Sequence, residues 1–229
     1  MNFPFDFPKD AELIHKDNFT IITKWNWDFK DCEAFQENCR EFVEKNRNYK
    51  FYIFTNHPHV FTHGRGNERG RDDLVDFQKE DAAKLDFPLH YIHRGGGLTF
   101  HYPGQWIAYP ILAVKEDFSL DDHMCWLLKG VREVLTESFN IDNVITAKKL
   151  MGVWREKKKL ASIGVGLKRY VTLHGLALNL NYDEKMFGAI QKINPCGMEA
   201  STYMSVDKVI QKENLLEEFH QAFLKKYLL

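Results

Sequence analysis

The chain has 229 residues, of which 44% are hydrophobic and 28% charged, and its formal net charge at pH 7 is −1. This composition is typical of a globular protein, and the near-zero charge excludes a general attraction to nucleic acid. The length is that of one domain, so we expect a single domain over residues 1–229. No basic region precedes a long apolar run near residue 1, and no later stretch is long enough to span a bilayer. We therefore expect a soluble, cytoplasmic protein without a membrane partner.

Apolar spacing in the first half of the chain predicts one helix and several strands. A helix is expected over residues 31–45, where it should pack over a sheet, and a strand over residues 50–55. Residues 67–86 are polar and charged, which predicts a loop followed by a short helix. Strands are expected over residues 87–93 and 105–114, and a glycine-rich loop lies between them.

The second half of the chain continues the mixture of helices and strands. A helix is predicted over residues 119–139, where Ser119 and Asp122 form a capping-box pattern ahead of a regular apolar stripe. Residues 152–165 and 170–181 are predicted as antiparallel strands, with residues 155–158 at the first turn. Residues 215–229 are predicted as a final amphipathic helix. The fold class is therefore α/β (α+β), without internal repeats or an interdomain linker.

The four cysteines have neither the spacing of a zinc site nor that of a disulfide framework. Cys32 and Cys39 lie seven residues apart on one face of a predicted helix, and Cys125 lies in another, so we interpret all three as packing residues. Cys196 differs because it lies in a Pro-Cys-Gly sequence. Proline and glycine together predict a sharply turned loop, on which a thiol can point into a cleft.

Three histidines, His57, His59 and His63, lie close together in the sequence. A metal site there is conceivable, but the turn-and-strand context contains no accompanying carboxylate. We therefore favour surface or hydrogen-bonding roles and expect no metal.

A cluster of three lysines precedes a stretch that is predicted as a buried strand. Residues 157–159 are lysines, and the following LASIGV sequence is apolar and small. One of these lysines could lie beside the thiol of Cys196, where an ammonium would stabilise the nucleophilic thiolate and a desolvated lysine could also relay protons. Such a pair suits acyl transfer. The alternative is that Cys196 is a small core residue, as most cytosolic cysteines are.

Several blocks of the sequence resemble the lipoyl(octanoyl) transferase family, which moves an octanoyl group from acyl carrier protein to a lipoyl domain. The first set comprises residues 159–164 (KLASIG), 174–179 (HGLALN) and 194–197 (NPCG). Residues 94–105 (RGGGLTFHYPGQ) resemble that family's arginine and glycine-rich signature followed by its His-Gly-Pro-Gly-Gln motif. A weaker element of the family is matched by residues 57–65 (HPHVFTHGR).

The resemblance covers about residues 50–200 and departs from the family pattern at three positions. Tyr102 stands where the family usually has glycine, His63 where leucine is common, and Gly97 where a polar residue is frequent. These differences concern the shape of the acyl pocket and the preferred chain length, and they leave the proposed nucleophile unchanged.

The resemblance implies a catalytic pair. Cys196 is implied as the nucleophile that carries the acyl group as a thioester, and Lys159 as the residue that holds it as thiolate. We assign Lys159 because the family's lysine directly precedes an aliphatic and a small residue. Strand alternation then directs Lys158 to the opposite face and leaves Lys157 in the charged turn.

The resemblance also implies the fold, the substrates and the binding residues. The expected architecture is a central, largely antiparallel sheet flanked by helices, as in biotin and lipoate protein ligases. The implied donor is octanoyl-acyl carrier protein, and the implied acceptors are the lipoyl domains of 2-oxoacid dehydrogenases and the glycine cleavage H protein, with no cofactor. Arg94, Thr99 and His101 are expected at the polar rim of an acyl tunnel. The implied substrate-binding residues are Arg94, Gly95, Gly96, Gly97, Leu98, Thr99, Phe100, His101, Ser162, Ile163, Gly164, Gly175, Leu176 and Ala177.

Two other functions stay open at the level of the sequence. An ATP-dependent lipoate protein ligase would share the fold and the lysine without requiring Cys196. A non-catalytic module that binds acyl carrier protein or lipoyl domains would keep the surfaces without the nucleophile. Basic residues near the proposed site could steer acidic partners, although an ordinary solvated face is an equal alternative. These residues are Arg65, Arg69, Arg71, Lys157, Lys158, Lys168 and Arg169.

Overall fold

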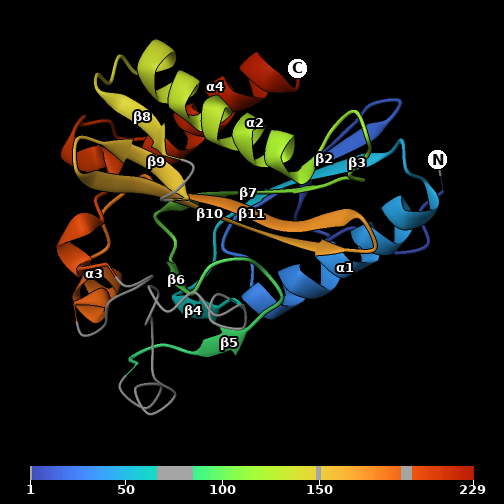
Figure 1. Ribbon diagram of the computed structural model, residues 1–229, viewed down its shortest axis with the longest axis horizontal. Helices are drawn as coiled ribbons and strands as arrows, with labels where there is room; N and C mark the ends of the chain where they lie inside the picture. Colours follow the sequence, from blue (N-terminus) through green and yellow to red (C-terminus); the bar gives the residue numbers. More distant parts are fainter. Residues whose placement is uncertain (1, 66–84, 148–150, 192–197) are drawn as a thin grey trace.

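The computed structural model describes residues 2–65, 85–147, 151–191 and 198–229. Figure 1 shows a large sheet with helices on both of its faces. Its strands lie in the order β1 (Glu12–His15), β2 (Phe19–Lys24), β3 (Lys50–Thr55), β7 (Gln105–Ile111), β11 (Val171–Asn179), β10 (Lys158–Lys168), β9 (Gly152–Arg155) and β8 (Val144–Ala147). Neighbouring strands are antiparallel except β2 and β3, which are parallel. The expected central, largely antiparallel sheet is confirmed.

A smaller sheet lies beside the large one. Its strands are ordered β5 (Leu89–Tyr91), β4 (Val60–His63) and β6 (Leu98–His101). Strand β4 runs parallel to β5 and antiparallel to β6. In Figure 1 this small sheet lies below the large sheet, on the side of helix α1.

The helices divide between the two faces of the large sheet. Helix α1 (Phe29–Lys45) packs on one face, against β11 and β7. Helices α2 (Leu120–Glu133) and α4 (Leu215–Tyr227) pack on the other face. The shorter helical segments are a π-helical turn (Val134–Ser138), α3 (Glu184–Ile190) and two 3₁₀ turns (Ala200–Thr202 and Val206–Lys208). Across the described ranges, no helix combines the length and the apolar character that crossing a bilayer requires.

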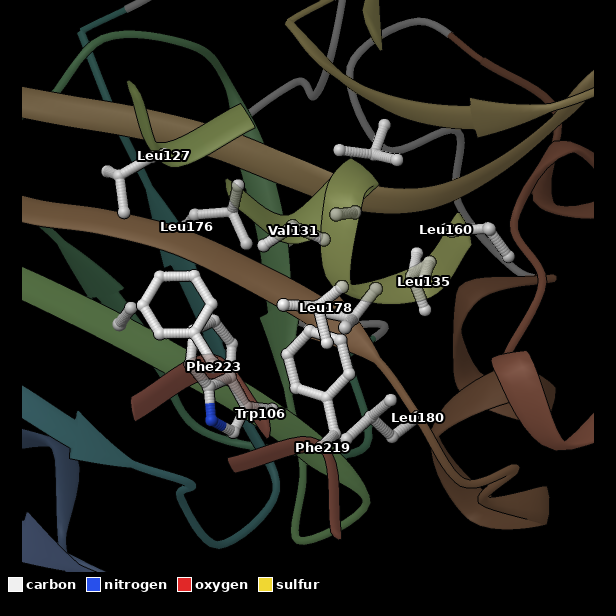
Figure 2. Close-up of a cluster of buried hydrophobic side chains, with 14 of the residues drawn as sticks. Trp106, Leu127, Val131, Leu135, Leu160, Leu176, Leu178, Leu180, Phe219 and Phe223 are labelled. Carbon is white, nitrogen blue, oxygen red and sulfur yellow. The ribbon is translucent and has the colours of Figure 1, made fainter. Parts of the chain in front are cut away.

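Strand β7 contributes side chains to the hydrophobic clusters on both faces of the large sheet, because successive side chains of a strand point to opposite faces. Trp106 and Ala108 pack in the cluster under α2 and α4, whereas Ile107 and Tyr109 pack in the cluster under α1. Figure 2 shows the first cluster, in which Trp106 lies against Phe223 and Phe219 of α4. Other labelled members of this cluster are Leu127, Val131, Leu135, Leu160, Leu176, Leu178 and Leu180.

Three predicted helices are present, with different ends, whereas the loop and short helix expected over residues 67–86 lie, except for the last two residues, outside the described residues. Helix α1 starts at Phe29, two residues earlier than expected, because the carboxylate of Asp28 accepts hydrogen bonds from the backbone N–H groups of Lys30 and Asp31. Helix α2 begins with the expected capping box of Ser119 and Asp122. Its last predicted turn is π-helical, and the C-terminal helix ends at Tyr227 rather than at residue 229.

The predicted strands are also present, and three are shorter than expected, among them the strand predicted over residues 170–181, which covers Val171–Asn179. The strand predicted over residues 87–93 covers only Leu89–Tyr91, because Pro88 has no N–H group for a ladder and the chain turns at Ile92. The strand predicted over residues 105–114 ends at Ile111. The predicted turn between β9 and β10 is confirmed and contains Glu156 at a φ of 56°.

The interpretation of the cysteines as packing residues is right for two of the described three. Cys32 and Cys39 are fully buried under α1, and burial raises the pKa of the Cys39 thiol well above its usual value. Cys125 is exposed, so its assignment as a packing residue is wrong. The buried stripe of α2 contains Leu127, Leu128 and Val131, and Cys125 lies off that stripe.

Candidate active site

The glycine-rich loop after β5 is attached to both sheets by Arg94. This side chain is 7% exposed, and its Nη2 donates to the backbone oxygen and to Oγ1 of Thr62 at 2.9 Å each. Its Nη1 donates to the backbone oxygen of Gly95 at 2.9 Å, and the backbone N–H of Gly95 donates to Val165 on β10. Arg94 and Gly95 therefore together link β4, the loop and β10, and the buried Arg94 side chain also lines the larger pocket described below.

Two glycines that face this loop, Gly64 and Gly164, allow its close approach to β4 and β10. A Cβ atom at Gly164 would lie 3.0 Å from the backbone oxygen of Gly95, and one at Gly64 would lie 2.3 Å from that of Gly96. Gly97 accepts a hydrogen bond from the backbone N–H of Gly64. Gly95, Gly96 and Gly97 thus pack the loop against β4 and β10, and they do not line the pockets described next.

Two adjoining pockets lie between the small sheet and the β10–β11 hairpin. The larger contains about 330 Å³ of empty space and the smaller about 230 Å³, both including the part that is open to solvent. They share Thr99, Ser162 and Ala177. The larger pocket is lined by Phe29, Ile92, Arg94, Thr99, His101, Tyr109, Ser162, Ile163, Gly164, His174, Gly175, Leu176 and Ala177. The smaller is lined by Leu98, Thr99, Phe100, Gln105, Ser162, Ala177, Asn179 and Tyr203.

Fourteen substrate-binding residues are predicted from the sequence. Eleven of them line the two pockets, and the other three are the loop glycines Gly95, Gly96 and Gly97. Sequence reasoning missed other lining residues, among them Phe29 at the start of α1, Tyr109 on β7 and Tyr203. Each lies outside the recognisable motifs. Their positions depend on which strands and helices meet at the pocket, so no local signal marks them.

His101 is held in one tautomer by its neighbours. The side-chain Nε2 of Gln105 donates to the backbone oxygen of Phe100 at 3.0 Å and to Oδ1 of Asn179 at 2.9 Å. Its Oε1 therefore accepts from Nδ1 of His101 at 3.0 Å, which leaves Nε2 of His101 unprotonated, 3.5 Å from Oγ1 of Thr62. Burial holds the pKa of His101 well below its usual value, so this ring is a neutral acceptor at pH 7.

His57 is a second neutral imidazole behind the pocket. Its Nδ1 donates to the backbone oxygen of Trp27 at 2.7 Å, so its Nε2 accepts from the hydroxyl of Tyr109 at 3.1 Å. Burial lowers the pKa of His57 to about 4. His174, which lines the pocket, has its pKa lowered to about 3 by burial and next by the charge of Arg94. The pocket thus combines a fixed guanidinium with neutral rings.

His59 confirms a hydrogen-bonding role for the histidine group, with a partner that the sequence did not reveal. Its Nε2 lies 2.9 and 3.0 Å from the two carboxylate oxygens of Asp183, the N-cap residue of α3. This carboxylate is 124 residues away in the chain, so no local pattern indicates it. Residues 2–65, 85–147, 151–191 and 198–229 contain no group of three or more potential metal ligands.

Lys159 points inward, as strand alternation and the choice of register predicted. It is 3% exposed, whereas Lys157 and Lys158 are exposed, and Nζ of Lys158 donates to the backbone oxygen of Ser201. A β-bulge lies between Lys159 and Ala161 in the pairing with β9. Cys196, like Arg69 and Arg71, lies outside the described residues.

The bulge determines where the Lys159 side chain goes. Leu160 and Ala161 both pack in the cluster under α2, although consecutive residues of a regular strand would face opposite sides. A Cβ atom at Gly152 would lie 2.8 Å from Cε of Lys159, and Gly152 pairs with Ser162. The lysine stem therefore runs alongside Ser162, which lines both pockets.

Two of the three departures from the family pattern, Tyr102 and His63, have side chains with different surroundings. Tyr102 is fully buried in the cluster that contains Phe100, and it fits because a Cβ atom at Gly104 would lie 2.6 Å from its ring. His63 is half-buried beside Tyr91, with ring centroids 5.6 Å apart. Neither residue lines a pocket, so an effect of Tyr102 on the acyl site would act through Phe100.

Comparison with known proteins identifies the family of this chain. The model of the lipoyl protein ligase A/B catalytic domain matches residues 28–228. The chain belongs to this family. An octanoyltransferase of Christiangramia forsetii is 34% identical over 218 residues, which is 89% of this chain and 89% of the relative. An octanoyltransferase of Bacteroides fragilis strain YCH46 is 34% identical over 228 residues, covering 90% of this chain and 99% of the relative. The protein is accordingly an acyltransferase.

Solved structures of protein ligases have a similar fold to this chain. A crystal structure of lipoate-protein ligase A bound with ATP superposes with a TM-score of 0.63 at 11% identity, covering 93% of this chain and 84% of the ligase. The biotin protein ligase of Leishmania major in complex with biotinyl-5-AMP superposes with a TM-score of 0.52 at 11% identity, covering 92% and 73% of the two chains. The expected likeness of this acyltransferase to lipoate and biotin protein ligases in fold is confirmed.

Proposed function

We propose that this acyltransferase moves an octanoyl group from octanoyl-acyl carrier protein to the target lysine of lipoyl domains, through a thioester on Cys196. One observation carries the proposal: of three consecutive lysines, only Lys159 is buried, and its stem runs beside Ser162 at the pockets. A buried lysine next to a ligand pocket is a candidate for charge stabilisation and proton transfer. The names of the curated relatives support the octanoyl group.

In the first half-reaction, the Cys196 thiolate attacks the carbonyl carbon of the donor thioester. A new carbon–sulfur bond forms at Cys196, the bond to the carrier's sulfur breaks, and the departing thiolate takes a proton from the Lys159 ammonium. One thioester replaces another, so the step is nearly balanced in free energy and requires no ATP.

In the second half-reaction, the neutral amine of the acceptor lysine attacks the enzyme thioester. An amide bond forms, Cys196 leaves again as thiolate, and the proton lost by the amine returns to Lys159. The amide is more stable than the thioester, so this step drives the cycle. The proposed partners are the lipoyl domains of 2-oxoacid dehydrogenases and the glycine cleavage H protein.

The pockets supply suitable surroundings for an acyl chain. Leu98, Phe100 and Tyr203 provide apolar surface in the smaller pocket, and Ile163 and Leu176 in the larger. Met198, two residues after Cys196 in the sequence, packs against the cluster that contains Phe100 and Tyr203. We also propose that residues 1–229 form one catalytic domain, because residues of both sheets line the same pockets.

The test is intact-mass analysis of the protein after mixing with octanoyl-acyl carrier protein. The wild type should gain one octanoyl group, and Cys196→Ser should gain none under the same conditions, because a serine hydroxyl lacks an accessible anionic form. Cys125→Ser is the matched control and should label like the wild type, since Cys125 is exposed on α2. Equal labelling of wild type and Cys196→Ser would refute the nucleophile assignment.

The same samples distinguish the alternatives from the sequence. Consumption of ATP with free lipoate would indicate a ligase, and binding of the carrier without any mass change would indicate a non-catalytic module. Addition of a lipoyl domain to the acylated wild type should transfer the octanoyl group to the domain, which mass analysis of the domain detects.

A further inference from the structure

Trp154 on β9 is the residue directly opposite Lys159 on β10. Paired residues of neighbouring antiparallel strands present their side chains on the same face of the sheet. The Nζ atom of Lys159 lies 5.5 Å from the centroid of the Trp154 ring, within the range of cation–π attraction. The ammonium of Lys159 therefore lies over an aromatic face.

If only the volume of the side chain mattered at this position, Trp154 would make the folded protein less stable than an apolar residue of similar size. The residue is 6% exposed, and its Nε1 is buried without a hydrogen-bond partner in the part of the chain that the structure describes. An unpartnered buried N–H group is destabilising, whereas leucine or phenylalanine would fill similar space without this group. An indole does have a stronger attraction for cations than any other side-chain ring.

Gly152, two residues before Trp154 on the same face of β9, provides room for the lysine. A Cβ atom at Gly152 would lie 2.8 Å from Cε of Lys159 and 2.2 Å from the backbone oxygen of Ala161. The stem of Lys159 thus crosses β9 where no side chain intervenes. The ring of Trp154 borders one side of this path, and Ser162 at the pockets borders the other.

The ionisable side chains next to Lys159 on β9 and β10 have partners other than the Trp154 ring. Arg155 on β9 pairs with Glu156, and Lys158 on β10 is exposed and bonded to Ser201. Tyr203, which bridges to Lys159 after the 3₁₀ turn Ala200–Thr202, lines the smaller pocket.

We propose that Trp154 is a positioning residue whose indole face holds the Lys159 ammonium in its charged form and directs it toward the pockets. The consequence for catalysis rests on the proposed function of Lys159 and Cys196. A lysine held charged but away from bulk water keeps a neighbouring thiolate stable and still has a proton to donate.

The test measures the pKa of Lys159 directly. In protein labelled with ¹³C and ¹⁵N lysine, the ¹⁵Nζ shift of Lys159 is followed against pH by NMR, and the signal is assigned by its loss in Lys159→Arg. Removing the attractive face favours the neutral amine, so Trp154→Leu should lower the proton affinity of Lys159 about 3- to 10-fold. Trp154→Phe should cause a smaller decrease. The exposed Lys158 is the internal control and should not change.

Fluorinated tryptophan tests the same point without a change of shape. Fluorine withdraws charge from the ring face, so 5-fluorotryptophan at all five tryptophans should lower the pKa of Lys159, and a more fluorinated analogue should lower it further. The matched control is Trp154→Phe grown on the same analogue, in which fluorination should have no effect on Lys159. This series remains informative even if Trp154→Leu fails to fold.

An unchanged pKa of Lys159 in the fluorinated wild type would overturn the proposal. So would an equal decrease in Trp154→Phe and Trp154→Leu, since packing alone would then explain the effect. Failure of the proposed function is distinguishable: full octanoyl transfer by Lys159→Ala would refute the catalytic role of the lysine, whereas the NMR measurement would still report on Trp154.

Discussion

At the scale of single residues, the site separates two kinds of ionisable group by burial and hydrogen bonding. His57, His101 and His174 are buried and neutral at pH 7, and hydrogen bonds fix the rings of His57 and His101. The Arg94 guanidinium stays charged and donates hydrogen bonds to Thr62 and Gly95. The histidines are therefore suited to accept hydrogen bonds and to shape the pocket, and the proposed mechanism assigns proton transfer at neutral pH to Lys159.

The first prediction concerns the effect of Lys159 on the thiol of Cys196. Lys159→Ala should raise the pKa of Cys196 by on the order of one unit, because a nearby ammonium stabilises the thiolate. The alkylation rate of the thiol should shift to higher pH, and both half-reactions should slow about 100-fold or more. Lys159→Arg should keep part of the thiolate stabilisation yet fail as a proton relay, since a guanidinium is never deprotonated at these pH values.

The structure defines how this measurement is made. Cys125 is exposed and would react with the same reagent, so every variant carries Cys125→Ser, whereas Cys32 and Cys39 are buried. Lys158→Ala is the matched control, because Lys158 is the exposed neighbour of Lys159. If Lys158→Ala shifted the alkylation profile and Lys159→Ala did not, the assigned lysine would be wrong by one residue.

At the scale of elements, helix α2 carries a buried ionisable group that the site does not use. His123 is fully buried in its first half, and both ring nitrogens are without a hydrogen-bond partner among the residues described. Burial lowers the pKa of His123 to about 4. The helix therefore contains a polar side chain that destabilises it at neutral pH and more so in mild acid.

We predict that His123→Leu stabilises the protein and flattens its acid dependence. The unfolded chain, with a histidine pKa near 6.5, binds more protons than the folded protein between pH 6.5 and 4, so wild-type stability decreases as pH falls through this window. The variant should be more stable by about 1 kcal/mol at pH 7.5 and by about a further 2 kcal/mol at pH 5.0. Urea unfolding at both pH values measures the difference.

The control for this prediction is Met124→Leu, a partly buried neighbour on the same helix that does not titrate. It should leave the pH dependence of the unfolding free energy as in the wild type. Parallel acid dependences of the wild type and His123→Leu would show that His123 takes up no proton on unfolding.

At the scale of the whole molecule, the structure narrows the set of basic residues that could steer acidic partners. Lys168 pairs with Glu37 at 2.5 Å, and Arg169 pairs with Glu44 at 3.4 Å, so carboxylates of α1 balance both charges. Lys157 and Lys158 remain exposed beside the turn that leads to Lys159. Arg65 is also exposed, and its Nη2 is bonded to Nδ1 of His93. Any steering by the described residues therefore depends chiefly on this lysine turn and on Arg65.

We predict that octanoyl transfer at low donor concentration slows as salt rises, because screening weakens the attraction between a basic patch and an acidic carrier. The double variant Lys157→Gln, Lys158→Gln should have a lower rate at low salt and a weaker salt dependence. The matched control is Lys16→Gln with Lys45→Gln. Lys16 follows β1, at the opposite edge of the sheet from β9 and β8. Identical salt dependence in all three proteins would exclude a steering role for the lysine turn.

Local patterns in the sequence determined the elements and the chemistry to look for. Helical spacing and the capping box located α1 and α2, and the motif around Lys159 selected one lysine of three. These features are predictable because a helix, a cap or a strand's alternation depends on residues a few positions apart. The motif around Cys196 identifies the proposed nucleophile, which lies outside the described residues.

Only the tertiary structure decided what surrounds those residues. The bulge after Lys159, the ring of Trp154 opposite it, and the pairing of His59 with Asp183 depend on strand register and on contacts between distant segments. The exposure of Cys125 contradicts the expectation for the same reason. Burial is a property of the assembled layers, and many registers of the same strands are compatible with one local pattern of apolar residues.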